Sequence, residues 1–557
     1  MPTSPSDPRP GPRADAPAPP SADLAVVGAG PAGLAGAVTA ARLGLSVVLL
    51  DAADRPGGQY YRHPASGLGA ARPEALHHGW RAFAELEAAL RAHRSAGRIT
   101  YLPGHHVWSV TGAAPHWTLH AVASGPAAPA DRAATGAGVG AGVGAGVGGV
   151  GDGSAGEPDG EPYGERPATV HARAVLLATG AYERQLPFPG WTLPGVVGAG
   201  GAQAMLKAGL VLPGRRVVVA GSGPLLLAVA GSLAAAGARV PAVVEAAAYT
   251  GYAGELPALL RNPGKLAEGV LHGGALLRHQ VRLLSRHAVT AAHGTDRVQA
   301  VTVSRLDRDW RPVPGTGRTI PCDALAVGHG LVPQLELATA LGCTTRRTAD
   351  GTRALVLDAD QLTSVPGLWS AGETGGIGGA QLALAEGELA AHAVARALRG
   401  TLAAGGPVPA APAAPVRRRA RLRAFADAMA AAHEPGAGWT GWLTDDTDVC
   451  RCEEVPAGRI REAVADLGAT DARTVKLLTR AGMGWCQGRM CGPAVAALTG
   501  RDATADRRPL SCPVPLRHLA ALPQDGSAGL AGPAVPARPA GGSGAGPGAA
   551  DPSGTTH

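Results

Sequence analysis

Apolar positions along the chain fall into blocks that alternate between strand and helix patterns. Residues 22–52 read as an apolar strand, a glycine turn, a helix and a second apolar strand, "ADLAVVGAGPAGLAGAVTAARLGLSVVLLDA". The same order recurs at 214–247, and residues 365–395 read as a strand, a glycine turn and a helix. Near-continuous apolar strands separated by helices are typical of a parallel sheet covered on both faces. The pattern therefore predicts α/β units, one of them nested inside the other.

A glycine-rich stretch and two tails break this pattern. Strand-like runs at 116–122 and 168–177 flank residues 134–167, whose glycines repeat without any strand-to-helix context. We interpret this stretch as a flexible insertion in a surface hairpin. Residues 1–22 and 523–557 have too little apolar content to offset the entropy of ordering, so the sequence predicts two disordered tails.

Composition and charge exclude several classes of protein. The chain has 557 residues, 45% of them apolar, which is enough for two to four domains with sizeable cores. The formal charge is +7, and the densest basic run, "VRRRARLRAF" (416–425), has a helical pattern without stacking aromatics. We interpret it as a solvated helix face and expect no nucleic-acid partner. No N-terminal apolar region and no run of about 18 apolar residues occurs, so we expect a cytoplasmic protein without an integral membrane segment.

The glycine turn at 28–33 has the form of a dinucleotide-binding loop. Gly28 permits a tight turn, Gly30 lets the backbone approach a pyrophosphate, and Gly33 lets helix and strand pack closely. The N-terminus of the helix then faces the phosphates. Asp51 ends the second strand, where its carboxylate can accept hydrogen bonds from ribose hydroxyls. The sequence therefore predicts a bound dinucleotide here.

The second unit carries a similar but altered loop. Gly221 and Gly223 are present, Leu226 replaces the third glycine, and Glu245 stands 22 residues after Gly223 as a candidate ribose ligand. The fold is expected, whereas NAD(P) or another adenine nucleotide in this site is an open possibility. No basic cluster follows Glu245, so the sequence does not favour the 2′-phosphate of NADP. No C-x-x-C motif lies beside either glycine loop, so a redox-active disulfide that would relay electrons is not supported.

Four of the seven cysteines lie close together near the end of the chain. Cys450 and Cys452 form a C-x-C pair, and Cys486 and Cys491 form a C-x4-C pair in the glycine-punctuated segment "GMGWCQGRMC". A [2Fe–2S] cluster takes four thiolates, and structural zinc usually takes C-x2–4-C knuckles at both ends. The spacing favours the cluster, with zinc and unliganded buried cysteines as the alternatives. Cys322, Cys343 and Cys512 are isolated and are assigned no role.

Together with "LLATGAYER" (176–184), the glycine loops resemble the flavoprotein family that has two dinucleotide-binding domains. The resemblance implies FAD at the first loop, with Glu373 standing where the family has an aspartate near the ribityl chain. It also implies that the helix opening near Gly379 directs its positive end at the flavin. The remaining FAD-binding residues that the resemblance implies are Ala32, Gly58, Gln59, Val107, Gly180 and Gly372.

The cysteine segment resembles the bacterioferritin-associated-ferredoxin-like [2Fe–2S] domain. The whole pattern predicts an α/β fold with two nested Rossmann-like dinucleotide-binding domains, followed by a small, mainly helical [2Fe–2S] domain. The first FAD-binding part is predicted at 23–192, the second nucleotide domain at 193–318 and the second FAD-binding part at 319–399. The rest of the chain is assigned to a linker at 400–415, a helical arm at 416–445, the [2Fe–2S] domain at 446–500 and a C-terminal extension at 501–522.

With "ATGAYERQLPFPGWTLPGVVGAGGAQAMLKAG", the chain resembles the FAD-binding large subunits of the opine oxidase, hydrogen cyanide synthase and hydroxyproline dehydrogenase group. The resemblance implies an electron-transferring role beside a catalytic partner that is D-amino-acid-oxidase-like, with a small redox acceptor as a further partner. No acid/base set is evident, so the catalytic residues are unknown, and His329 is interpreted as structural. The alternatives are a stand-alone NAD(P)H-dependent reductase of a small redox protein and a non-catalytic iron–sulfur assembly or scaffold protein.

Overall fold

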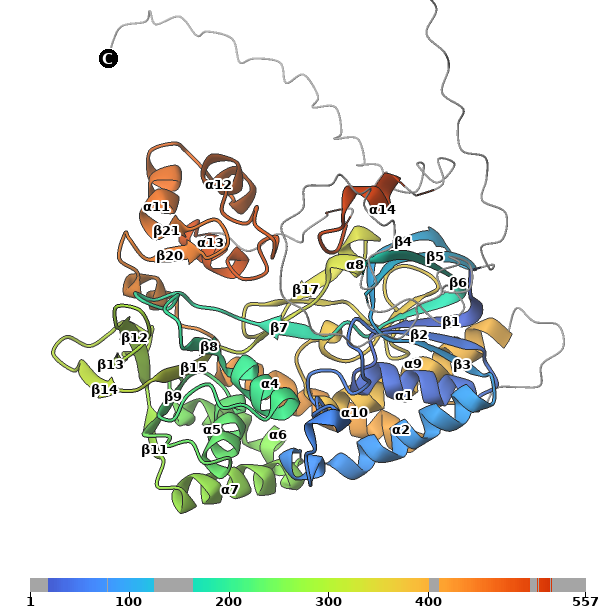
Figure 1. The fold of residues 1–557 in the computed structure, drawn as a ribbon, viewed down its shortest axis with the longest axis horizontal. Helices are drawn as coiled ribbons and strands as arrows, with labels where there is room; N and C mark the ends of the chain where they lie inside the picture. The colour runs from blue at the N-terminus through green and yellow to red at the C-terminus, as the bar shows by residue number, and fades with distance from the viewer. Residues whose placement is uncertain are drawn as a thin grey trace, which may run out of the picture.

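The first of two main sheets is built from segments that lie far apart in the chain (Figure 1). The computed structural model describes residues 19–77, 79–124, 164–399, 410–500, 508, 510–520 and 522. The strand order is β3-β2-β1-β6-β5-β4, and β19 also pairs with β6. The strands are β1 (Ser21–Val27), β2 (Val47–Leu50), β3 (Ile99–Leu102), β4 (His105–Ala113), β5 (His116–Ala123), β6 (Arg166–Leu177) and β19 (Leu368–Ser370).

One face of this sheet is covered by helices from distant parts of the chain. Leu24 and Val26 of β1 are fully buried in a core shared with those helices, as their apolar run requires. The other face packs against the helix α8 (Glu336–Ala340) and the hairpin of β17 (Thr345–Arg347) and β18 (Arg353–Leu355). The covering helices are α1 (Pro31–Arg42), α2 (Trp80–Ser95) and α9 (Ala380–Arg399).

The second sheet is wholly parallel and lies between β6 and β19 in the chain, so the nested arrangement is confirmed. Its order is β11-β10-β9-β15-β8. The strands are β8 (Val196–Gly198), β9 (Val217–Gly221), β10 (Ala242–Glu245), β11 (Arg282–Ser285) and β15 (Ala324–Gly328). The helices beside it are α4 (Ala199–Gly209), α5 (Leu225–Ala235), α6 (Leu256–Leu260) and α7 (Pro263–Arg278).

Small antiparallel elements join and extend the two sheets. A short pair of strands, β7 (Ala181–Glu183) and β16 (Leu331–Pro333), carries the chain between them. The opposite face of the second sheet is covered by a three-stranded sheet of β12 (His287–His293), β13 (Ala300–Arg305) and β14 (Arg318–Pro321). Short 3-10 turns occupy Ser66–Leu68, Pro73–Leu76, Tyr249–Glu255 and Glu373–Gly375.

The predicted helical arm is α10 (Ala413–Ala432), which lies against α9 and α6 and so touches both nucleotide domains (Figure 1). Arg417, Arg418 and Arg421 are exposed, as the solvated-face interpretation predicts. Arg423 instead turns inward, donating to Glu386 of α9 at 2.7 Å and to the carbonyl of Gly376 at 2.8 Å. Glu386 is almost completely buried, so this ion pair anchors the arm to the first domain.

Replacing Arg423 with alanine should destabilise the chain by about 3 kcal/mol, because it leaves the Glu386 carboxylate buried without its main cation. The matched control is Arg396→Ala, which breaks a solvent-exposed pair with Asp360 and should cost less than about 1 kcal/mol. Urea unfolding of both variants measures the difference. Equal losses in the two variants would mean that the Arg423–Glu386 pair does not anchor the arm.

The cysteine-bearing domain is small and mostly helical. It comprises the turn η5 (Ala437–Trp442), β20 (Asp448–Cys450), β21 (Val455–Pro456), α11 (Ala457–Ala465), α12 (Ala472–Thr479) and α13 (Gly492–Leu498). Its core is continuous with that of the second nucleotide domain, because Trp439 and Trp442 are buried beside Trp310. The Trp442 indole donates to the Trp310 carbonyl at 2.9 Å, and the Trp191 indole donates to the Asp448 carbonyl at 2.6 Å. The domain is therefore packed onto the body.

Several predicted boundaries are wrong. The second nucleotide domain does not end at 318, because β15 pairs with β8 and β9 in the second sheet. An isolated apolar run such as 324–328 does not reveal which of two parallel sheets it joins. The predicted N-terminal tail ends before residue 22, since β1 begins at Ser21. The predicted glycine-rich insertion ends before residue 166, where β6 begins. The helix α10 begins at Ala413, inside the predicted linker.

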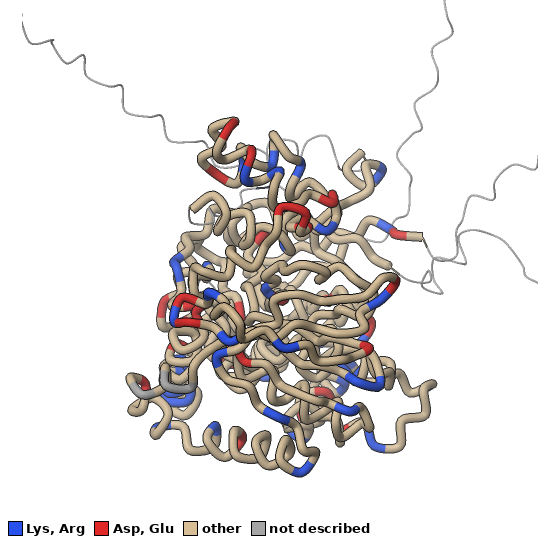
Figure 2. Tube along the Cα trace, turned by 90° about the vertical axis from the view of Figure 1, so that its left-hand side faces the viewer, with Lys and Arg blue, Asp and Glu red and all other residues tan. Residues whose placement is uncertain are grey.

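Other predictions fall partly or wholly outside the described residues. The 134–163 part of the insertion, the 400–409 part of the linker and the tail at 523–557 lie outside them, although β5 and β6 do pair as an antiparallel hairpin across the insertion. The extension beyond 508 includes α14 (Leu516–Ala520) and packs on Trp108, where the Ser511 amide donates to the Trp108 carbonyl. Figure 2 shows acidic and basic positions interspersed on the side that it presents. No described helix is long and apolar enough to cross a membrane.

Candidate functional site

The first glycine loop requires glycine at two positions for different reasons. Gly28 has a φ of +102°, and a side chain there would lie 2.4 Å from the carbonyl oxygen of Ala178. A Cβ at Gly33 would lie 1.8 Å from the carbonyl oxygen of Gly28. α1 therefore packs directly against the turn that follows β1, which is how a helix N-terminus is brought to a phosphate.

Small residues leave an open space, here called the cradle, beside Gly30 and Gly180 at the N-terminus of α1. The nearest atom to a Cβ built on Gly30 is the Cα of Gly58, at 3.9 Å, and nothing lies within 4 Å of one built on Gly180. Gly372, with a φ of +85°, places the β19 turn against the side chain of Ala32. The loops that the sequence predicts for FAD are thus brought together, and the unfilled space beside Gly30 fits a pyrophosphate.

Asp51 lies at the end of β2 beside this cradle. Its carboxylate accepts hydrogen bonds from the amides of Ala29 and Ala53, each at 3.2 Å, and it is half-buried. Burial raises the pKa of Asp51, opposed by these amide hydrogen bonds. The residue is held at the loop with part of its surface accessible, as a ribose ligand requires.

The flavin end of the site differs from the expectation in one respect. The amides of Gly378 and Gly379, just before α9, do not point at open space but donate to the Glu373 carboxylate at 2.7 and 3.0 Å. The longer side chain of glutamate lets it turn back onto the helix start. These two hydrogen bonds engage the positive end of α9. Burial raises the pKa of Glu373, and the two amides oppose that rise.

The remaining predicted FAD residues are placed unevenly. Gln59 is exposed next to Gly58. Val107 is buried in β4 within the apolar core beside β1 and β2. Lys207 of α4, which sequence reasoning missed, donates to the Tyr60 carbonyl at 3.2 Å and holds this loop; burial lowers its pKa to about 8. Its only signal in the sequence was that it is the one charged residue in the run "AQAMLKAGL".

The second glycine loop has the expected turn but a closed surface. Gly221 and Gly223 have φ values of +134° and +116°, and a Cβ at Gly221 would lie 1.7 Å from the Gly328 carbonyl oxygen. Leu226 is buried in the core of the domain, and Glu245 is only 3% exposed. Gly221 and Gly223 therefore form a Rossmann-like turn, but the Glu245 side chain beside it is buried.

The four clustered cysteines are brought together as two pairs. Cys450 of β20 is hydrogen-bonded with Cys491, which precedes α13, and Cys452 is hydrogen-bonded with Cys486. Each pair therefore joins one cysteine from each end of the domain. Gly484 makes this approach possible, because a Cβ there would lie 2.2 Å from the Cβ of Cys452.

The surroundings of Cys450 favour its thiolate, whereas the hydrogen bond with Cys450 and burial raise the pKa of Cys491, and burial raises the pKa of Cys452. The hydrogen bond from Cys491, together with the amide of Gly482 at 3.4 Å, lowers the pKa of Cys450 to about 6 against the opposing effect of burial. Among the described residues, no group of three or more His, Cys, Asp or Glu side chains is placed to hold a single metal ion. Two pairs of thiols fit a cluster of two irons with two thiolate ligands each.

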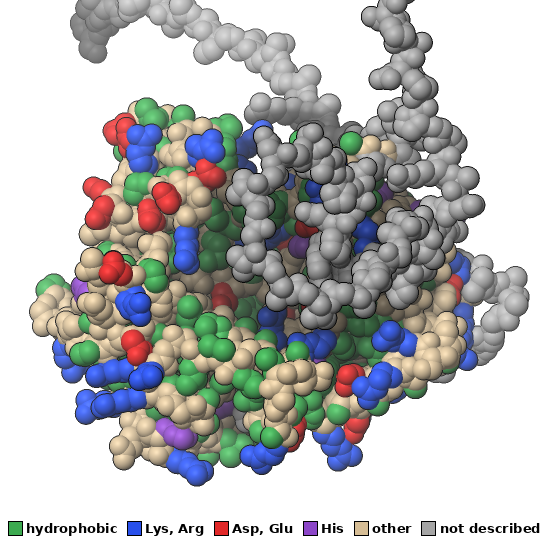
Figure 3. Space-filling model, in the orientation of Figure 1, with side chains coloured by type: hydrophobic (Ala, Val, Ile, Leu, Met, Phe, Trp, Pro, Cys, Tyr) green, Lys and Arg blue, Asp and Glu red, His purple; other side chains and the backbone are tan. Residues whose placement is uncertain are grey.

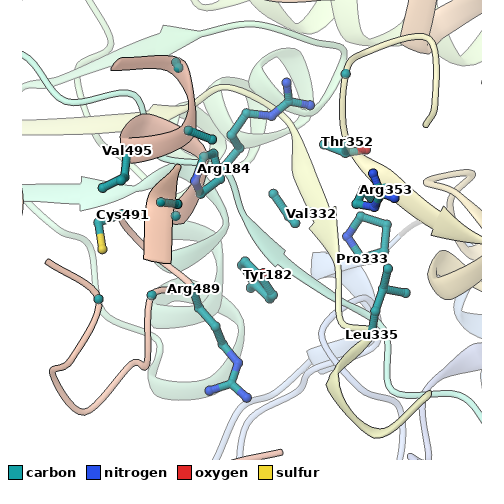
Figure 4. A pocket seen from close by; sticks show the side chains of 18 of the residues that line it. Tyr182, Arg184, Val332, Pro333, Leu335, Thr352, Arg353, Arg489, Cys491 and Val495 are labelled. Carbon is teal, nitrogen blue, oxygen red and sulfur yellow. The ribbon is translucent and has the colours of Figure 1, made fainter. Parts of the chain in front are cut away.

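A cleft of about 870 Å³ separates this cysteine loop from β7, β16 and β18, and Figure 3 shows the surface hollowed beneath the cysteine domain. Its walls come from the cysteine domain, which contributes Arg489 and Cys491, and from the β7–β16 link and β18, which contribute Arg184 and Arg353 (Figure 4). Seven basic and three acidic side chains line it. The cleft therefore has an excess of positive charge.

Two buried ion pairs, both missed from the sequence, stabilise the walls of this cleft. Arg489 donates to Glu336 of α8 at 2.7 Å and to the Ser511 carbonyl, and Arg184 is paired with Asp350. The Arg184 guanidinium and two threonine hydroxyls hold the pKa of Asp350 below its usual range despite burial. Each ion pair joins segments more than 150 residues apart, so no local sequence pattern could indicate it.

His329 and the isolated cysteines have structural surroundings. His329 is buried between Trp310 and Trp442, and burial lowers its pKa to about 3, so the ring is neutral. Cys322, Cys343 and Cys512 are each buried in an apolar core. These placements agree with the interpretation of the four residues as structural.

Comparisons with known proteins agree with this arrangement. Residues 22–387 match the pyridine nucleotide-disulphide oxidoreductase family, and residues 449–500 match the BFD-like [2Fe–2S] binding domain. The hydrogen cyanide synthase subunit HcnB of Pseudomonas aeruginosa is 34% identical, over 84% of this chain and 90% of its own length. An opine oxidase subunit of Agrobacterium tumefaciens is 34% identical, over 86% of this chain and 85% of its own length.

One solved structure supports the fold at lower identity. The crystal structure of L-proline dehydrogenase from P. horikoshii aligns with a TM-score of 0.55 at 18% identity, over 89% of this chain and 76% of that one. The α/β fold class with nested Rossmann-like units is therefore confirmed, as is the resemblance drawn from the glycine and cysteine motifs.

Proposed function

Because the chain belongs to the pyridine nucleotide-disulphide oxidoreductase family and carries a BFD-like [2Fe–2S] binding domain, we propose that it is the electron-transferring subunit of a heteromeric dehydrogenase. Its cofactors are FAD and a [2Fe–2S] cluster. The enzyme oxidises a C–N bond of an amine or amino acid. The relatives are named as subunits of hydrogen cyanide synthase and opine oxidase, which supports this assignment.

The observation that carries the proposal is the continuous core between the cysteine domain and the flavoprotein body. Trp310, Trp439 and Trp442 join them, and Arg489 ties the cysteine loop to α8. A scaffold that hands over its cluster would need to expose or release this domain. Fixed packing instead suits two redox centres held at a constant separation.

The chain's own residues have defined tasks in this function. When bound, FAD supplies two-electron chemistry and the cluster supplies one-electron transfer. Gly28, Gly30 and Gly33 hold the pyrophosphate at α1, and Asp51 holds the ribose. Cys450, Cys452, Cys486 and Cys491 are the cluster ligands, and the glycines around them offer amides that tune its potential.

The substrate is oxidised on a second subunit in this proposal. We infer a D-amino-acid-oxidase-like partner, with an opine, glycine or hydroxyproline as the class of substrate, and a small redox protein as the final acceptor. The motifs that resemble the opine oxidase and hydrogen cyanide synthase group support this division of labour. A stand-alone NAD(P)H-dependent reductase is the competing function, and Glu245, covered by its surroundings, argues against it.

Anaerobic absorption spectroscopy tests the proposal. The purified chain should stay oxidised with NADH, NADPH, glycine, hydroxyproline or an opine, because Glu245 of the second nucleotide turn is buried and the proposal places substrate oxidation on the second subunit. Joined with its oxidase-like partner, it should lose flavin absorbance within seconds of adding one of these amino acids. Rapid bleaching of the isolated chain by NADH would establish the reductase function instead.

A further inference from the structure

The second glycine loop faces the chain's own helical arm. α10 ends at Ala432, and the following residue, His433, lies between the turn after β9 and the turn after β10. These are the two turns that hold the pyrophosphate and the adenosine ribose in a Rossmann-like domain. The arm therefore ends at the place where a nucleotide would bind.

His433 makes contacts that the nucleotide would otherwise make. Its Nδ1 is 3.2 Å from the Ser222 hydroxyl, within the glycine loop, and 3.7 Å from Oε1 of Glu245. Its Nε2 is 2.5 Å from the hydroxyl of Tyr252. Behind it, a Cβ built on Gly251 would meet the backbone of Ala432 at 3.6 Å. Side chain and backbone of the arm both cover the turn.

The Glu245 carboxylate is already hydrogen-bonded within the protein. Its two carboxylate oxygens accept hydrogen bonds from the amides of Gly223 and Ala247 at 3.1 and 2.9 Å, and only 3% of the residue is exposed. Asp51 has equivalent amide partners at the first loop but remains half-buried. The two sites in one chain thus differ by the cover that His433 provides.

Leu226 supplies an independent argument. At the equivalent position of the first loop, a Cβ on Gly33 would lie 1.8 Å from the Gly28 carbonyl oxygen. A residue with a side chain cannot reach that position, so α5 must stand farther from its turn than α1 does. The helix N-terminus is then set back from the place where it would meet a pyrophosphate.

We infer that the second nucleotide fold is not an NAD(P) site and that the arm residue His433, with Tyr252 and Ser222, occupies its ribose position. The second nucleotide domain instead serves as the surface against which the helical arm packs. Arg423 fastens the arm to α9, and Asn262 beside α7 donates to the Arg421 carbonyl at 3.2 Å. The arm consequently locks the two nucleotide domains together, and electrons must reach this chain from a donor other than a pyridine nucleotide.

Calorimetry and hydrogen exchange on the cofactor-loaded chain test this inference. NADH, NADPH and ADP-ribose should show no saturable binding up to about 1 mM. His433→Ala should speed amide exchange in residues 219–226 and 243–252 by at least about tenfold, because both segments lose the contact that closes them. His293→Ala, in an exposed position of β12, is the control and should leave both segments unchanged.

Ser222→Ala provides a milder variant of the same network, in case His433→Ala does not fold. It removes one hydrogen bond and little volume, and should speed exchange in the same segments. Saturable binding of any of the three nucleotides to the wild-type chain below about 1 mM would overturn the inference. Unchanged exchange in the folded variants would also overturn it.

Discussion

Replacing Cys486 with serine should remove the iron–sulfur cluster and leave the flavin bound. A [2Fe–2S] cluster needs four thiolates, so iron and acid-labile sulfide should fall from about two each per chain to nearly none. Cys486 is the sound choice because it is only half-buried, whereas Cys450 and Cys491 belong to the core that joins the domain to the body. Elemental analysis with flavin quantitation measures the change.

Cys343→Ser is the matched control for this experiment. Cys343 is buried in the core of the first domain and lies outside the thiol pairs, so its variant should keep full iron, sulfide and flavin. One zinc per chain in the wild type, lost in Cys486→Ser, would make the C-terminal domain a structural zinc domain. Full iron in Cys486→Ser would remove this residue from the ligand set.

Replacing Gly30 with alanine should abolish FAD binding without unfolding the chain. Gly30 has a φ of −73° and a ψ of −175°, which alanine adopts readily, and the nearest atom to the new methyl group would be 3.9 Å away. The methyl group would occupy the open cradle where the pyrophosphate approaches the backbone. FAD content after anaerobic purification should fall by about tenfold or more.

The contrast with two other glycines makes this prediction specific. Gly33→Ala should unfold or distort the first domain, because its methyl group would lie 1.8 Å from a backbone oxygen. Gly231→Ala, within α5, meets only a side-chain methyl at 3.8 Å, so it should leave the FAD content unchanged and should not lower the melting temperature. Normal FAD content in Gly30→Ala would mean that the cofactor does not approach this loop.

Local patterns predicted the parts of the site that local geometry determines. A tight turn, a close helix and a carboxylate at the end of the next strand lie within about 25 residues of one another, so Gly28, Gly33 and Asp51 could be read directly. The same holds for the cysteines, whose two pairs meet across a domain of about 50 residues. The fold class followed from the alternation of apolar strands and helices.

Contacts between distant segments could not be predicted. His433 lies 211 residues from Ser222 in sequence, and nothing in the arm's helical pattern indicates that its end closes a nucleotide turn. The placement of β15 in the second sheet depends on pairing rather than on its composition. The Glu373 carboxylate accepts hydrogen bonds from the two amides just before α9, a contact that the motif alone does not indicate.

An anaerobic reductive titration of the purified, cofactor-loaded chain tests the central claim most directly. A chain that holds one FAD and one [2Fe–2S] cluster as working redox centres should take up about three electrons, two into the flavin and one into the cluster. Flavin absorbance and the signal of the reduced cluster should account for all of them. An uptake of only about two electrons, with no cluster signal, would contradict the account and leave a simple flavoprotein.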